Sequence, residues 1–275
     1  MVSIGYRDLA EFGVPFATPK DADFPALLRD IEGRWQMFEH GAADGRSAVL
    51  INNSGKSIVA LAYIWRYKTA NGETRISYHS NLSSSMQMDV FSGRIGAVHD
   101  AGSFIMPGSK RLITEDGMYG NNFDVLSADS AHRRGGGVGA GMGRGGWRNR
   151  GEDAQYAQIE LQLDVVFFDD GLCAGPDDTG LFESVREDLE QQLRTAQQVV
   201  QARRSGASWG AVFEILRPLA RRSIRHIPGR DCPADLLFMF ANVGIDHIIN
   251  DNEPEVLAWF EDFAKPSSFH VRRPA

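Results

Sequence analysis

The sequence predicts an α+β protein in which an antiparallel, β-sandwich-like sheet is followed by a helical C-terminal region. Short strand-like runs, separated by turn residues and without helices between them, occupy residues 45–173. After Gly175 the apolar residues recur with the 3.6-residue period of amphipathic helices. We therefore expect three parts: an N-terminal capping segment (1–44), a sheet domain (45–175) with a Gly/Arg-rich loop (132–151), and a helical region (176–275).

The composition is that of an ordinary globular protein, with 275 residues, of which 43% are hydrophobic and 24% are charged. No window approaches the ~20 apolar residues that a transmembrane helix needs. The first residues, MVSIGYRDLAEFGVPFA, lack the features of a secretory signal, so a cytoplasmic protein is expected unless a signal has been removed. Cys173 and Cys232 show no metal-ligand spacing, and two reduced thiols are preferred to a disulfide.

The charges are segregated along the chain, although the net charge is only −7. Residues 151–200 carry twelve acids and two Arg, residues 201–230 carry seven Arg and one Glu, and residues 231–262 carry eight acids and no base. Such blocks favour ion pairs between segments of one fold as readily as binding to an outside partner. The negative total argues against a protein that coats nucleic acid.

The N-terminal segment contains one predicted helix. Asp23-Phe24-Pro25 begins a run at helical spacing, and Pro25 stands where the first turn of a helix tolerates proline. The apolar positions of this run are Leu27, Leu28, Ile31, Trp35 and Phe38.

Three strands are predicted between Ala48 and Leu82, with turns at Asn53-Ser54-Gly55 and Asn71-Gly72. Both turns are interpreted as hairpins, and Asn-Gly is typical of the type I′ turn. The middle strand is apolar on both faces, which indicates a central strand covered on both sides. A further strand, turn and strand are predicted from Phe104 to Thr114.

The clearest strand follows the Gly/Arg-rich loop. Five apolar residues from Ile159 to Phe167 alternate with Gln158, Glu160, Gln162 and Asp164, which predicts a half-buried strand. Asp170-Gly171 then predicts a hairpin turn.

A long helix is predicted next, with Asp177, Asp178 and Thr179 supplying its N-terminal cap and Gly206 following its last residues. Its apolar stripe comprises Phe182, Val185, Leu189, Leu193, Ala196 and Val200. Further helices are expected to start at Ser208, to cover Ala234–Val243, and to run from Pro254 to before Pro266.

The junction between strand and helix resembles a segment of uncharacterised bacterial proteins. In those proteins a β-sandwich-like region ends in a strand with an F-x-D-G-x3-G-P-D pattern and passes into a long helix. The matching residues are Phe168, Asp170, Gly171, Gly175, Pro176 and Asp177. The resemblance covers about a fifth of the chain, supports the order of sheet and helix, and implies no activity.

One candidate nucleotide site begins at Asn53-Ser54-Gly55-Lys56-Ser57, which resembles the end of a phosphate-binding loop, with Asp170 as a magnesium-holding acid. That chemistry needs a glycine where Leu50 stands, and a helix where a strand is predicted. A turn is therefore the favoured interpretation.

A candidate esterase site begins at Ser208, which stands at the centre of a G-x-S-x-G pattern, with Asp246, His247 and His270 following. The nucleophile of such enzymes follows a strand, whereas here a helix precedes Ser208. The favoured interpretation is that Ser208 caps a helix.

Neither metal nor cofactor is predicted. Asp169, Asp170, Asp177 and Asp178 form a possible carboxylate cluster, but turn and cap chemistry explains them, and the histidines have no zinc spacing.

A candidate anion site is formed by Arg217, Arg221 and Arg225, which lie at i, i+4 and i+8 and would form one basic stripe on a helix. Pairing with acidic segments of the same chain is the favoured interpretation, and Pro218 interrupts the pattern. The Gly/Arg-rich loop resembles RNA-binding segments but is short, and a flexible loop is preferred.

No coherent catalytic constellation is present, so the favoured function is a non-enzymatic binding or scaffolding module. A protein partner is preferred to nucleic acid. The alternatives are a hydrolase acting on an ester or a nucleotide phosphate, built from Lys56 and Asp170 or from Ser208 and His247, and a protein that binds anions or RNA through its Arg-rich segments.

Overall fold

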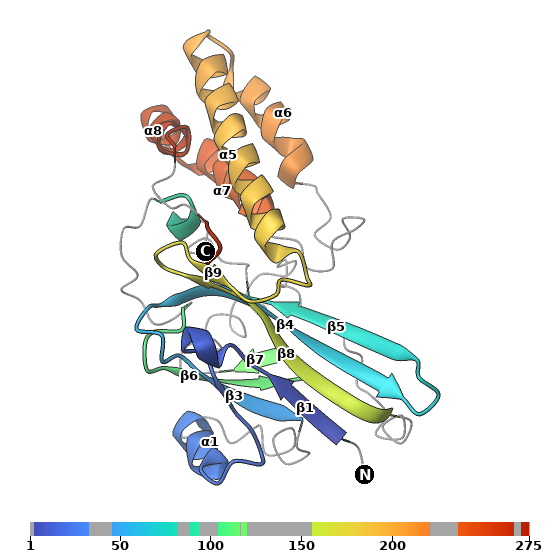
Figure 1. The fold of residues 1–275 in the computed structure, drawn as a ribbon. Helices are drawn as coiled ribbons and strands as arrows, with labels where there is room; N and C mark the ends of the chain where they lie inside the picture. Colours follow the sequence, from blue (N-terminus) through green and yellow to red (C-terminus); the bar gives the residue numbers. More distant parts are fainter. Residues whose placement is uncertain are drawn as a thin grey trace. The chain divides into compact units, whose positions relative to one another are not determined.

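The protein is α+β, and most of its helices lie in the C-terminal part of the chain (Figure 1). The computed structural model describes residues 3–32, 46–81, 89–93, 104–115, 117–119, 156–220, 236–266 and 271–274. Its internal contacts divide the chain into two compact units. The first comprises Met1–Asn81, His99–Phe168 and Ala174–Pro176, and the second comprises Leu82–Val98, Asp169–Cys173 and Asp177–Ala275. The three-part division expected from the sequence stays a prediction.

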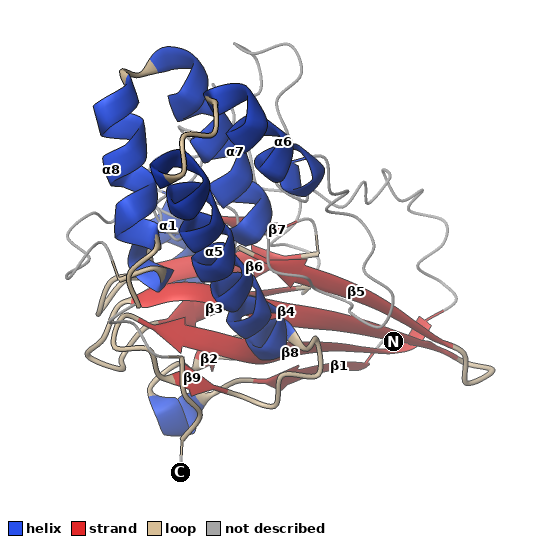
Figure 2. Ribbon diagram, turned by 90° about the horizontal axis from the view of Figure 1, so that it is seen from above, coloured by secondary structure: helices blue, strands red, loops and turns tan. Residues whose placement is uncertain are grey.

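The larger sheet of the first unit is mixed. In the described residues its order is β1 (Ser3–Arg7), β8 (Tyr156–Phe168), β4 (Ile58–Thr69) and β5 (Thr74–Ser80), and β9 (Cys173–Ala174) also pairs with β8 (Figure 2). β1 runs parallel to β8, whereas the β8–β4 and β4–β5 pairs are antiparallel. The prediction of a wholly antiparallel sheet is therefore wrong for β1, because a segment expected only to cap the fold supplies an edge strand.

The second sheet of this unit is antiparallel, with the order β2 (Phe16–Ala17), β3 (Ser47–Ile51), β6 (Lys110–Thr114) and β7 (Gly117–Tyr119). A short helical turn, η1 (Ala10–Phe12), precedes it. The predicted N-terminal helix is α1 (Phe24–Glu32), whose Leu27, Leu28 and Ile31 pack against Val49 and Leu112 of the sheet. Trp35 and Phe38 lie outside the described residues.

The turn at Asn53-Ser54-Gly55 does not form a hairpin, because β3 and β4 belong to different sheets. The buried Asn52 holds this loop. Its amide nitrogen donates to the carbonyls of Lys56 (2.8 Å) and Ile105 (2.6 Å), and its oxygen accepts from the Ser54 hydroxyl (2.6 Å). A buried asparagine that hydrogen-bonds to both sides of a loop stabilises a loop that crosses from one sheet to the other. Local turn propensity does not distinguish such a loop from a hairpin.

The second predicted hairpin is present and joins β4 to β5, but its turn is not of type I′. The Gly72 amide donates to the Thr69 carbonyl, the Thr69 amide donates to the Glu73 carbonyl, and φ is positive (+91°) at Gly72 and not at Asn71. This is the pattern of a three-residue hairpin loop with glycine in the left-handed position. β4 is central and buried, as predicted.

The strand β8 is more deeply buried than its alternating pattern predicts. Gln162 is 4% exposed and Asp164 is fully buried. The Arg66 guanidinium donates to the Gln162 side chain (2.5 Å), and the Gln162 amide lies 3.4 Å from the Asp164 carboxylate. Burial of the polar side is tolerated because these groups bind one another.

The second unit contains α5 (Leu181–Arg204), α6 (Trp209–Ala220), α7 (Leu236–Asn250) and α8 (Glu253–Phe263). The last three all pack on α5. An aromatic cluster joins α7 to α8, with Phe240 5.3 Å from Trp259 and 5.0 Å from Phe263 between ring centroids. Gly244 makes room for it, because a Cβ there would lie 2.9 Å from the Phe260 ring.

The buried stripe of α5 contains polar as well as apolar residues. Val185, Ala196 and Val200 are buried as predicted, and so are Ser184, Asp188, Gln192 and Thr195. Asp188 accepts a hydrogen bond from the Leu237 amide (3.1 Å), and Gln192 donates to the Leu236 carbonyl (2.7 Å). The Asp188 side chain therefore caps the N-terminus of α7, where the amides lack partners within their own helix, and Gln192 ties the first residue of α7 to α5.

Ion pairs join the segregated charge blocks within the second unit. Arg203 pairs with Glu253 and stacks on the Trp209 ring, with 4.4 Å between the guanidinium carbon and the ring centroid. Arg204 lies 2.9 Å from Glu261. The basic end of α5 thus binds the acidic α8, as the charge pattern indicates.

Replacement of Gly175 by alanine should destabilise the first unit. Gly175 has φ of +114°, and a Cβ would lie 2.2 Å from the Asp164 carbonyl oxygen. Strain and overlap together should cost about 3 kcal/mol in the free energy of unfolding, measured in urea. Gly55→Ala is the control, because Gly55 also has positive φ but an added Cβ meets no atom within 4 Å. Equal losses in both variants would contradict this account.

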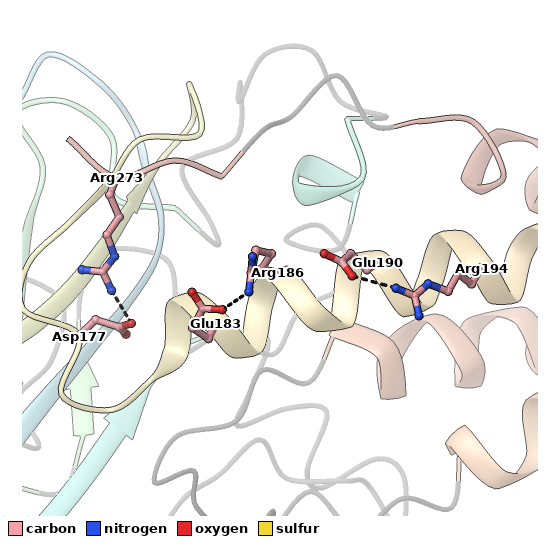
Figure 3. Close-up of polar contacts among 6 residues, drawn as sticks. All are labelled: Asp177, Glu183, Arg186, Glu190, Arg194 and Arg273. Carbon is pink, nitrogen blue, oxygen red and sulfur yellow. Dashed lines mark hydrogen bonds and ion pairs between the residues drawn. The ribbon is translucent and has the colours of Figure 1, made fainter. Parts of the chain in front are cut away.

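Replacement of Asp188 by alanine should destabilise the helical unit, because it leaves a buried amide of α7 without its acceptor. A loss of about 2 kcal/mol is expected in urea unfolding followed by far-UV circular dichroism. Glu190→Ala is the control, because Glu190 pairs with Arg194 (3.0 Å) between exposed side chains (Figure 3). That change should cost less than about 0.5 kcal/mol. A similar loss in both variants would show that the cap contributes little.

Candidate protein-binding edge

The outer edge of β5 presents backbone groups to the side away from β4. The Thr69 amide bonds to the Glu73 carbonyl and the Asn81 amide bonds to the Leu61 carbonyl, which places the odd-numbered residues of β5 in the hydrogen-bonded pairs with β4. The N–H and C=O groups of Thr74 and Ile76 therefore point outward. Within the described residues, β5 pairs with β4, and no second strand pairs with it on this side.

The side chain of Ile76 makes this edge partly apolar. Ile76 is 40% exposed, and it is one of two large hydrophobic side chains of the described residues that are exposed, the other being Ile249 of α7. Thr74 and Arg75 beside it are exposed as well. The outward-facing backbone groups of an edge strand can pair with a strand of another chain, and an exposed side chain beside them offers apolar contact.

A groove of about 550 Å³ lies at the hairpin end of β4 and β5. Its lining combines two threonines, one acid, one base and one tyrosine, namely Thr69, Thr74, Glu73, Arg75 and Tyr156. The groove and the outer edge share Thr74 and Arg75, so a segment that pairs with β5 would reach the groove. We call Thr74–Ser77 together with this groove the β5 edge.

The inner face of β5 is held firmly on β4. The rings of Tyr63 and His79 stack with 4.9 Å between centroids and 1° between planes, and the Ser77 hydroxyl lies 3.0 Å from the His79 imidazole. Trp65, the register partner of Ser77, is buried and donates to the Thr114 carbonyl (3.1 Å). The edge therefore belongs to a strand whose inner face is fixed by these contacts.

The sheet face that carries Ile76 continues as a polar row. Ile76 is opposite Arg66, whose guanidinium lies 3.3 Å from Glu160, and Glu160 lies 3.4 Å from Arg7 of β1. Arg66 and Glu160 are largely buried, whereas Arg7 is mostly exposed. The row carries two arginines and one glutamate, and Glu160 offsets the charge of one arginine.

The shifted pKa values found among the described residues lie on the N-terminal side of the sheet. Burial, and to a smaller extent the negative charge of Asp21, raises the pKa of Tyr6 to about 12. Hydrogen bonds from the Thr18 amide (2.6 Å) and hydroxyl (2.8 Å) lower the pKa of Asp21. Local packing and turn geometry explain both shifts, so neither indicates an acid or base prepared for catalysis.

The candidate anion site can be followed only at Arg217. It lies in α6, 2.5 Å from Glu214 one turn earlier on the same helix. Arg221 and Arg225 lie outside the described residues, as do the Gly/Arg-rich loop and Cys232. The basic stripe therefore stays a prediction. The Cys173 thiol is buried.

The candidate hydrolase residues have local structural partners. The Lys56 amine lies 5.7 Å from the centre of the Phe168 ring, and a strand follows it, as predicted. The Ser208 hydroxyl accepts from the Ala211 amide (3.3 Å) at the start of α6, in the position of the predicted cap. His247 pairs with Asp251, and within the described residues no hydrogen bond joins it to Ser208.

The aspartates of the strand-to-helix junction bind arginines and backbone amides. Asp170 accepts from the Leu172 amide (3.0 Å) and lies 3.1 Å from Arg272, and Asp177 accepts from the Phe182 amide (3.1 Å) and lies 2.7 Å from Arg273. Asp177 therefore caps α5 as predicted, although the residue just before the helix is Gly180. Among the described residues no three His, Cys, Asp or Glu side chains are grouped as metal ligands.

Sequence reasoning missed the candidate binding features that depend on which strands and segments pair with one another. Ile76 reads as an ordinary inward strand residue until β5 is known to be an edge, and Arg272 and Arg273 carry no signal of their own at the far end of the chain. The available clue was the excess of acids in residues 151–200, which contain the junction, because it indicates that arginines from elsewhere in the chain bind there.

Comparison of the chain with protein-family models, curated proteins and solved structures found no match. None of the described helices combines the length and the hydropathy needed to cross a membrane. No relative supplies a function, so the following proposal depends on the geometry of the chain itself.

Hydrogen exchange should alternate along the β5 edge. The amides of Thr74 and Ile76 point away from β4 and should exchange about 100-fold faster than those of Arg75 and Ser77, which bond to β4. Two-dimensional NMR of the labelled protein in D₂O measures this. Equal protection of all four amides would show that the edge is already paired, and would contradict an open strand-addition site.

Proposed function

We propose that the protein is a non-enzymatic binding module that takes an extended segment of a partner protein onto the β5 edge. The observation that carries the proposal is the outward-facing backbone of Thr74 and Ile76 beside the exposed Ile76 side chain. A strand added there continues the ladder of the sheet, and its alternate side chains contact Ile76 and the groove.

The magnitudes favour a partner that uses both parts of the site. Two residues offer up to four backbone hydrogen bonds, each worth about 0.5–1.5 kcal/mol net. Complete burial of the exposed part of Ile76 adds about 1 kcal/mol. Association costs at least about 4 kcal/mol in lost translational and rotational freedom, so the backbone alone binds weakly. Contacts in the groove supply the remaining affinity.

The charges of the site indicate the chemistry of the partner. Glu73 and Arg75 line the groove with opposite signs, so a segment with a base and an acid at alternate positions is complementary to it. The chain carries a net charge of −7, which opposes binding along a nucleic acid backbone. A protein segment is therefore preferred to RNA or DNA.

The alternatives receive less support. The contacts of Lys56, Ser208 and His247 described above are structural, which does not favour a hydrolase. An anion- or RNA-binding role depends on Arg221, Arg225 and the Gly/Arg-rich loop, for which the described residues offer no contact.

Two finer features belong to the same proposal. We infer that the two sheets of the first unit form a sandwich-like core, which the bond from the Trp65 indole of β4 to the Thr114 carbonyl of β6 supports. We also infer a cytoplasmic location, which the buried, reduced thiol of Cys173 supports.

Replacement of Ile76 by proline should abolish binding without unfolding the protein. Proline removes the outward amide, while the bonds from β5 to β4 come from the neighbouring residues. In a pull-down with wild type and Ile76→Pro as baits, wild type should retain a partner that uses the edge, and Ile76→Pro should not. Its affinity for the purified protein, measured by calorimetry, should fall at least about tenfold.

Ile76→Val is the matched control, because it keeps the backbone donor and most of the apolar surface. Its affinity should stay within about threefold of wild type. The bound partner should also protect the Thr74 and Ile76 amides from exchange. A partner that binds Ile76→Pro as tightly as wild type, with the circular dichroism spectrum unchanged, would overturn the proposed edge.

A further inference from the structure

The second unit contains an extended segment that is bound like a peptide ligand. Val271–Pro274 lies beside the turn that follows β8, where Arg272 forms a parallel bridge with Leu172. The Cys173 amide donates to the Arg272 carbonyl (2.8 Å), and the Arg272 amide donates to the Gly171 carbonyl (3.0 Å). The segment is thus held by its backbone on both sides of one residue.

The Arg272 side chain binds Asp170 at two points. One guanidinium nitrogen donates to the Asp170 carbonyl (2.7 Å), and another lies 3.1 Å from its carboxylate. The planar fork of arginine matches this pair of acceptors, whereas the single ammonium of lysine does not. Asp170 is fixed for this role, because its carboxylate also accepts from the Leu172 amide (3.0 Å).

The Arg273 side chain binds a carboxylate that is almost completely buried. Asp177 is 3% exposed in its side chain and lies 2.7 Å from the Arg273 guanidinium (Figure 3). The guanidinium carbon also lies 4.8 Å from the centre of the Phe182 ring. Asp177 has φ of +60° and accepts from the Phe182 amide, so the start of α5 fixes its position. A buried carboxylate at a helix N-terminus, with an aromatic ring against which the cation can stack, favours an arginine.

Successive residues of an extended segment point to opposite sides, and here each of two adjacent arginines meets its own aspartate. We propose that Asp170, Asp177, Phe182 and the backbone of Gly171–Cys173 form a binding site for an extended Arg-Arg segment of a partner protein. The Arg272-Arg273 pair of the chain occupies the site as an internal competitor. Its contacts define the ligand chemistry, because none of them depends on which chain supplies the segment.

The internal competitor has a high effective concentration, because it belongs to the same chain. A partner therefore binds only when the internal segment is displaced or weakened. This site is independent of the β5 edge, since it uses other residues in the other unit of the chain.

A synthetic peptide, FHVRRPA, labelled with fluorescein tests the proposal by fluorescence anisotropy. The full-length variant Arg272→Ala/Arg273→Ala has lost the side chains that hold the internal segment, and it should bind the peptide at least about tenfold more tightly than wild type. The control peptides FHVAAPA and FHVKKPA should bind the variant at least about tenfold more weakly than FHVRRPA. Binding should also weaken as salt is raised.

Two further substitutions in the double variant locate the peptide. Asp177→Asn keeps an acceptor for the Phe182 amide but removes the charge, and it should reduce peptide affinity at least about tenfold. Asp178→Asn changes the exposed neighbour and should leave the affinity unchanged. Arg273→Lys, in an otherwise native chain, preserves the charge of the internal segment and should bind the peptide with intermediate affinity.

The proposal is overturned if folded Arg272→Ala/Arg273→Ala and Arg273→Lys bind the peptide no better than wild type, or if Asp178→Asn reduces binding as much as Asp177→Asn. Concentration-dependent dimers of wild type that Asp177→Asn abolishes would assign the site to a second copy of the chain and overturn the partner protein as its occupant.

Discussion

The passage of the chain from sheet to helix depends on one close backbone contact. Gly175 approaches the carbonyl of Asp164 so closely that a side chain would overlap it. The register between β8 and β4 skips Asp164, because it shifts between the pairs Ala62–Val165 and Tyr63–Leu163. An extra residue bends a strand locally, and here it brings the Asp164 carbonyl against Gly175. The positive φ of Gly175 and the proline after it then set the direction in which the chain leaves the sheet.

The aspartates beyond this contact show how one residue type serves several needs. Asp170 and Asp177 each accept a backbone amide, and each also binds an arginine from the last described segment. A carboxylate has more acceptor positions than one amide uses, so a buried aspartate with a single amide partner keeps an unmet charge. Arginines neutralise that charge here. The contacts of Asp170 and Asp177 are thus explained by backbone amides and arginines.

Local patterns in the sequence predicted the elements well and their partners poorly. The period of the apolar residues predicted β4, β8 and α5, and Ser208 and Asp177 cap helices as expected. The loop at Asn52 was misread because a crossing between sheets and a hairpin use the same turn residues. Gln162 and Asp164 were expected on the exposed side of a half-buried strand, because polarity alone suggests exposure. The burial of Gln162 depends on Arg66, which lies 96 residues away in the chain, and Gln192 of α5 is buried against Leu236, which lies 44 residues away. No local pattern reveals these partners.

The two proposed sites use the same backbone chemistry and differ in their side chains, which makes them separable. At the β5 edge, outward amides and an isoleucine would bind a partner mainly through hydrogen bonds and apolar contact, with Glu73 and Arg75 adding charge in the groove. At the arginine site, two ion pairs supply much of the energy, and the carboxylate of one of them, Asp177, is nearly buried. Both sites therefore respond to salt, and the arginine site responds more strongly. The substitutions separate them, because Ile76→Pro should weaken only a partner that uses the edge, and Asp177→Asn only one that uses the arginine site.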